Sequence, residues 1–154
     1  MNTVTWTERV GLDRTKCAQA ARFDMAQGEA WEADFIQIPI FRTEDPQPRI
    51  MYLFAAVDAK TGEKRVWEKL VVDPKIPRNG SMDALKQLWE SLASRMLEGV
   101  LKRGMVPAEI HVRTQRVMRF MRPLGLQIPF KLVLHQQLPR LTTAVNNSIL
   151  NRSI

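Results

Sequence analysis

Several features that often reveal a protein's chemistry are rare or missing in this chain of 154 residues. A single cysteine, Cys17, excludes a disulfide within the chain and any zinc site that needs several cysteines. We therefore expect a reducing, cytoplasmic location, and the first residues do not resemble a signal peptide. The longest apolar run, residues 50–57, is too short to cross a bilayer, so we expect no membrane partner.

Common cofactor-binding motifs are also missing. The sequence contains neither G-x-x-x-x-G-K-[ST] nor G-x-G-x-x-G, the loops that bind phosphates. His111 and His135 are the only histidines, and without a nearby cysteine they make a weak metal pair. Cys17 lies among alanines of a predicted helix, where an inert buried thiol is expected rather than a nucleophile. We therefore expect no cofactor.

Acidic residues are missing from the last part of the chain. Residues 110–154 contain seven Lys or Arg and no Asp or Glu. Residues 1–109 contain 16 residues of each sign, so the whole net charge of +7 lies after them. Such asymmetry favours an anionic partner such as nucleic acid, although a basic surface can also serve solubility alone.

This basic part contains a regular arginine series, formed by Arg113, Arg116, Arg119 and Arg122. At about 100° per residue, the last three form one stripe of a predicted helix whose other side is apolar. Two interpretations remain open: a solvated helix face, or a row of phosphate contacts made by paired guanidinium donors. These four arginines are the candidate nucleic-acid-binding residues.

The remaining pattern predicts a mixed α/β fold with five strands. Residues 31–41, 50–57 and 63–72 are β-rich, are separated by turn-forming residues, and should pair antiparallel. Residues 109–113 and 127–134 alternate with predicted helices and should run parallel.

The sequence also predicts four helices. They span residues 13–27, ended by Gly28; a long segment from Ser81 to Gly104; residues 115–124; and residues 139–150. The order is therefore β-β-β-α-β-α-β-α after an N-terminal helix. We expect residues 1–29 to be a helical extension of a single domain that spans residues 30–154.

Three short segments carry a resemblance to a known fold. Trp31-x-x-Asp34 and the segment 52–58, followed by Thr61-Gly62, resemble the first two strands of retroviral-type integrase and transposase cores, which have a ribonuclease H-like fold. Residues 107–112 are similar to the segment that leads to their second catalytic acid. The chain also resembles a bacterial domain family without assigned activity, known by its W-x-A-D and V-D-x-x-T-G elements. The resemblance spans roughly residues 30–150 and implies a ribonuclease H-like mixed sheet.

Active members of this fold hold two divalent metals with clustered carboxylates. Asp34 matches the first acid, but Arg113 stands at the position of the second, and no acid follows Glu109 to supply the third. An arginine offers Mg²⁺ no ligand. Ribonuclease H proper takes another acid from its first core helix, for which Glu90 and Glu98 are available.

We therefore predict that Asp34, a weak catalytic candidate, forms a structural ion pair with Arg113 and binds no metal. Three functions remain open. The first is a catalytically inactive ribonuclease H-like binding or assembly module, with nucleic acid or protein as partner. The second is a Mg²⁺-dependent nuclease or integrase-like enzyme with rearranged acids. The third is a homo-oligomerising domain, suggested by the tryptophans Trp6, Trp31, Trp67 and Trp89.

Overall fold

A computed structural model describes residues 11–40, 49–72 and 86–151 of the chain. In chain order its elements are α2 (Arg14–Ala21), β1 (Met25–Ile40), β2 (Arg49–Asp58), β3 (Lys64–Val72), α4 (Leu92–Arg103), β4 (Val106–Val112), α5 (Gln115–Gly125), β5 (Lys131–Leu134) and α6 (Pro139–Leu150). The turn predicted after residue 42 and the helix start predicted at Ser81 lie outside the described residues.

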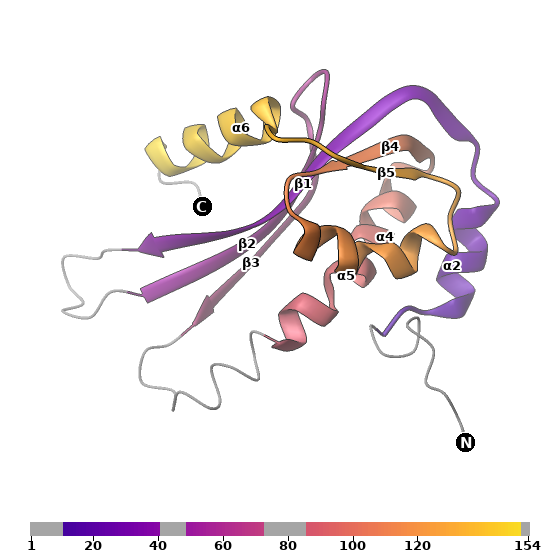
Figure 1. Ribbon diagram of the computed structural model, residues 1–154, viewed down its shortest axis with the longest axis horizontal. Coiled ribbons are helices and arrows are strands. Elements are labelled where there is room, and N and C mark those ends of the chain that lie inside the picture. The colour runs from indigo at the N-terminus through magenta and orange to yellow at the C-terminus, as the bar shows by residue number, and fades with distance from the viewer. Residues whose placement is uncertain (1–10, 41–48, 73–85, 152–154) are drawn as a thin grey trace.

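The described strands form one five-stranded mixed sheet in the order β3-β2-β1-β4-β5 (Figure 1). β1 and β3 each run antiparallel to β2. β4 runs parallel to β1, and β5 runs parallel to β4. The predicted mixed α/β fold, with three antiparallel strands followed by two parallel ones, is confirmed. β1 is the central strand, and it has one antiparallel and one parallel neighbour.

The boundary between the first helix and the first strand was predicted wrongly. α2 ends at Ala21 rather than at Gly28, and β1 begins at Met25, so the domain boundary predicted after residue 29 falls inside a strand. Gly28 has a φ of 78° and lies where the pairing of β1 with β4 shifts register. A positive φ is accessible to glycine without steric cost, and here it serves a bulge in a strand instead of a helix end.

The later elements agree better with the sequence pattern. α4 ends at Gly104, which has a φ of 75°, and α6 has the predicted bounds. β4 begins earlier than predicted, at Val106, and β5 begins later, at Lys131. These two differences arise because short apolar segments carry little information on where a strand begins.

Alternation along β1 divides its side chains between two cores. Trp31 and Ala33 face the core that α2, α4 and α5 cover. The opposite face packs against α6 through a smaller core formed by Leu53, Ala55, Val57, Leu138, Leu141 and Val145. Figure 1 shows α6 alone on one side of the sheet, with α2, α4 and α5 on the other. Among the described residues, no helix is long and apolar enough to cross a membrane.

Close packing of α4 on β3 at Gly99 yields a test of this layering. A Cβ atom on Gly99 would lie 2.5 Å from Cγ2 of Val66 and 3.2 Å from the backbone oxygen of Arg65. We expect Gly99→Ala to lower the free energy of unfolding by about 1–3 kcal/mol, because α4 or β3 must shift. Gly125→Ala in α5 is the matched control, since its nearest neighbours would be 3.8 Å away. Urea denaturation measures both variants, and an undiminished stability of Gly99→Ala would contradict the described packing.

Candidate functional site

β4 and β5 run parallel to β1, and their carboxyl ends lie together beside the middle of β1, at one edge of the parallel part of the sheet. Ligands of α/β proteins commonly bind outside this edge. The register pairs Ala33 with Val112 and Val112 with Leu134. The residues that follow these three are therefore neighbours. We name the polar residues on the α6 side of this edge the strand-end cluster: Glu32, Asp34, His111, Arg113 and His135.

Within this cluster the structure brings Asp34 and Arg113 together. Nη2 of Arg113 lies 3.0 Å from Oδ2 of Asp34. The second carboxylate oxygen, Oδ1, accepts a hydrogen bond of 2.8 Å from the backbone N–H of Phe35. The Asp34 side chain is only 5% exposed, whereas the Arg113 side chain is 53% exposed. The buried acid is thus satisfied by a guanidinium that remains half in solvent.

The environment of Asp34 disfavours its charged form. Burial raises the pKa of Asp34 above its ordinary value, and the Phe35 N–H and the Arg113 charge only partly offset this effect. Ionisation of this carboxyl therefore costs folding free energy near neutral pH.

The residues at this edge do not fit the metal pair that the ribonuclease H-like resemblance implies. Both oxygens of Asp34 already accept from donors, and one of those donors is cationic. Glu90 and Glu98 lie in the helical layer on the opposite face of the sheet, where Glu98 forms an ion pair with Lys16. Across the described ranges, no group of three or more His, Cys, Asp and Glu side chains could hold a metal ion.

Glu32 has a structural role that the sequence did not reveal. Its side chain is buried, and Oε1 accepts a hydrogen bond of 2.9 Å from the backbone N–H of Leu141, in the first turn of α6. Leu138, at the N-cap of that helix, makes no capping hydrogen bond with its side chain. Glu32 therefore satisfies a free N–H of α6 and places a negative charge at the positive end of the helix dipole.

The two histidines also lie together, although not as metal ligands. The rings of His111 and His135 are stacked, with centroids 4.1 Å apart and an interplanar angle of 20°. An imidazole nitrogen binds a metal in the plane of its ring, so two nearly parallel stacked rings do not converge on one ion. Nε2 of His111 is buried without a hydrogen bond, 3.7 Å from Oε2 of Glu109.

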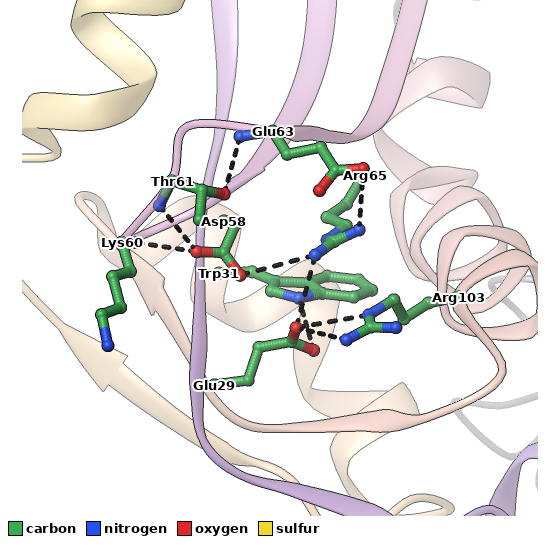
Figure 2. A network of polar contacts seen from close by, with 8 residues as sticks. All are labelled: Glu29, Trp31, Asp58, Lys60, Thr61, Glu63, Arg65 and Arg103. Atoms are coloured by element: carbon green, nitrogen blue, oxygen red, sulfur yellow. Dashed lines mark hydrogen bonds and ion pairs between the residues drawn. The ribbon is translucent and has the colours of Figure 1, made fainter.

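The V-D-x-x-T-G element forms the turn between β2 and β3 (Figure 2). Oδ1 of Asp58 accepts hydrogen bonds from the backbone N–H groups of Lys60, at 2.8 Å, and Thr61, at 2.9 Å. Gly62 has a φ of 77°, which the tight turn requires. The backbone N–H groups and Arg65 outweigh the opposing effect of burial, so the pKa of Asp58 is lowered. The need to form this tight turn explains why Asp58, Thr61 and Gly62 occur together in the V-D-x-x-T-G element.

Glu29 connects the same turn to the end of α4 (Figure 2). Its Oε1 lies 2.9 Å from Nη2 of Arg103 and 3.3 Å from Nη2 of Arg65. The same Nη2 atom of Arg65 lies 3.5 Å from Oδ2 of Asp58. Its Oε2 accepts a hydrogen bond of 3.3 Å from the indole N–H of Trp31. These ion pairs connect β1, β3 and α4, while Nε of Arg65 is buried without a hydrogen-bond partner.

The arginine stripe occupies the outer face of α5. Arg116, Arg119 and Arg122 are all exposed, while Val117 and Met121 are buried on the other side of the helix. The hydroxyl of Thr114 accepts a hydrogen bond from the backbone N–H of Val117 and begins the helix. Within the described part of the chain, none of the three arginines forms an ion pair. Arg113 differs from them because it is bound to Asp34.

Asparagine substitutions of Asp34 and Asp58 should show opposite pH dependence. Since the folded pKa of Asp34 is raised, its ionisation costs stability as the pH rises above about 4. Asp34→Asn should therefore gain stability relative to the parent protein between about pH 4 and 7. The lowered pKa of Asp58 contributes stability above about pH 4 that is lost as the pH falls through the folded pKa. Asp58→Asn should thus lose stability relative to the parent as the pH rises toward about 4.

Urea denaturation at a series of pH values measures both differences in the free energy of unfolding. The two variants control for each other, because each replaces one buried carboxylate by an isosteric amide. A parent protein that gains stability over Asp34→Asn toward neutral pH would contradict the described environment of Asp34.

Comparison with known proteins adds a family but no activity. Curated protein sequences contain no match to this chain. The model of the family described as "Domain of unknown function (DUF6930)" matches residues 19–147. This match runs from within α2, through the whole sheet, into α6, and covers most of the chain. The chain therefore belongs to the DUF6930 family.

Proposed function

We propose that this chain is a catalytically inactive ribonuclease H-like domain that binds nucleic acid through phosphate contacts on α5. The order β-β-β-α-β-α-β-α and the central position of β1 support this type of fold. The pairing of Asp34 with Arg113 supports inactivity, because a guanidinium stands where the resemblance requires a second metal-binding carboxylate.

The observation that carries the binding proposal is the exposed stripe of Arg116, Arg119 and Arg122. These guanidinium groups share one face of a helix, form no ion pair within the described residues, and belong to a part of the chain without acids. A row of cations that are not neutralised attracts a polyanion, and arginine matches phosphate geometry with paired donors. Phosphate contacts do not read bases, so the binding is independent of sequence.

The two other functions have less support. A metal-dependent nuclease needs clustered carboxylates, and in the described part of the structure no three His, Cys, Asp or Glu side chains are grouped so that they could hold a metal ion. An oligomer built on tryptophans is disfavoured because Trp31 is fully buried and Trp89 is 8% exposed, both in the main core. Trp67 is partly exposed but lies under the Lys64 ammonium, 4.0 Å from its ring centroid, and Trp6 is outside the described residues.

Replacing Arg116, Arg119 and Arg122 by glutamine should weaken binding to duplex DNA. Each lost phosphate contact should reduce the slope of log K against log salt by about 0.9, so three should reduce it by roughly 2.7. Glutamine has nearly the same helix propensity as arginine, so unchanged circular dichroism would assign the loss to charge. Fluorescence anisotropy of a labelled oligonucleotide between about 50 and 200 mM salt measures the slope.

Arg140→Gln is the matched control for this experiment. Arg140 is exposed on α6, on the other side of the sheet, and belongs to the same acid-free part of the chain. Its replacement should leave the salt slope nearly unchanged. The effect of Arg140→Gln is compared with the effect of the triple variant per replaced arginine. If the two reductions of the slope are equal, net charge and not the position on α5 explains the binding. If the parent protein shows no salt-dependent binding to any nucleic acid, the proposed function is wrong.

A further inference from the structure

Two of the three stripe arginines lie over aromatic rings. Cζ of Arg116 is 4.2 Å from the centroid of the Trp89 ring, and Cζ of Arg119 is 5.9 Å from the centroid of Phe120. Within the described residues, Arg122 has no such ring contact. The stripe is therefore not uniform: Arg116 lies close to a ring, Arg119 lies at the outer limit of such a contact, and Arg122 extends from α5 without one in the described residues.

The rings under these arginines belong to a continuous aromatic row, formed by Tyr52, Phe35, Trp89 and Phe120. Phe35 stacks on Tyr52 with centroids 5.6 Å apart, and its ring lies 4.3 Å from that of Trp89. Trp89 is 5.3 Å from Phe120, measured between centroids. Trp89 is almost fully buried, and Phe35 and Phe120 pack against the main core. The row is thus anchored in the core, and Arg116 lies over one of its buried rings.

From this geometry we infer that Arg116 and Arg119 stack on unpaired bases, so that the ligand of α5 is single-stranded nucleic acid. This inference rests on the proposed function and specifies its ligand. A guanidinium is planar, and one face resting on an aromatic ring leaves the other face open to a second flat group. Single strands offer unstacked bases to such a surface, as they do to exposed aromatic rings.

A duplex cannot use this surface in the same way. Its base faces are occupied by their own stacking, so a duplex offers α5 phosphates and groove edges but no free base face. Both ligands are anionic, and charge alone does not separate them. The inference therefore predicts a preference for single strands at equal length and equal salt, and it assigns that preference to the planar groups of Arg116 and Arg119.

Arginine-to-lysine substitutions separate stacking from charge. Lysine keeps the positive charge that contacts phosphate but has no planar group. The test is the double variant Arg116→Lys/Arg119→Lys, with Arg122→Lys as the matched control. Each is titrated by fluorescence anisotropy against one labelled mixed-sequence DNA oligonucleotide, presented as a single strand and as a duplex with its complement.

We expect the double variant to bind the single strand about five- to tenfold more weakly than the parent protein does, because stacking on a base is lost. Its affinity for the duplex should change by less than about twofold, since the number of phosphate contacts is unchanged. Arg122→Lys should change neither affinity by more than about twofold. An unchanged circular dichroism spectrum of the double variant checks that it is folded.

The outcomes distinguish this inference from the proposed function. Single-strand affinity that survives in the double variant would overturn the inference, and so would an equal loss on both ligands. A parent protein that prefers the duplex would also overturn it. In those three cases the binding of nucleic acid through α5 still stands. If the parent protein binds neither form, the proposed function fails and the inference fails with it.

Discussion

The burial of two carboxylates on the central strand β1 is the constraint on which the rest of the strand-end cluster depends. Glu32 and Asp34 lie on the α6 face of β1, with 4% and 3% of each residue exposed. A buried carboxylate is costly unless donors satisfy it, so each acid determines the position of a neighbouring element. Glu32 accepts the Leu141 N–H of α6, and Asp34 pairs with Arg113 at the end of β4. A slip of β1 by one residue would move both acids into the apolar core, which makes its register strongly specified.

The same strand, β1, connects the strand-end cluster to the arginine stripe on α5. Asp34 and Phe35 are consecutive and point to opposite faces of the sheet. Asp34 contacts Arg113 on one face, while Phe35 on the other face contacts Trp89, over which Arg116 lies. Adjacent residues of β1 thus contact the cation before α5 directly and a cation within α5 through Trp89. The proposed binding surface thus rests on the sheet as well as on α5.

The sequence predicts those parts of this structure that depend on local pattern. The order of strands and helices along the chain, the bounds of α6 and the outer face of α5 follow from periodicity and from turn residues. The proximity of Asp34 and Arg113 was predicted because the ribonuclease H-like resemblance implies that the first and fourth strands are neighbours. The contact of Glu32 with Leu141, 109 positions apart, and the contact of Glu29 with Arg103, 74 positions apart, have no local signal. The prediction that Gly28 ends a helix was wrong because a positive φ suits a helix end and a strand bulge equally well.

Arg113 neutralises the carboxylate of Asp34, in the middle of β1, and we expect no divalent metal to bind there. The most direct measurement is an NMR titration with Mn²⁺, which broadens signals of nuclei close to its binding site. The account predicts that the backbone amides of Asp34, Phe35 and Arg113 broaden no more than those near exposed acids such as Glu68. Saturable broadening centred on Asp34 at micromolar Mn²⁺, abolished in Asp34→Asn, would contradict it.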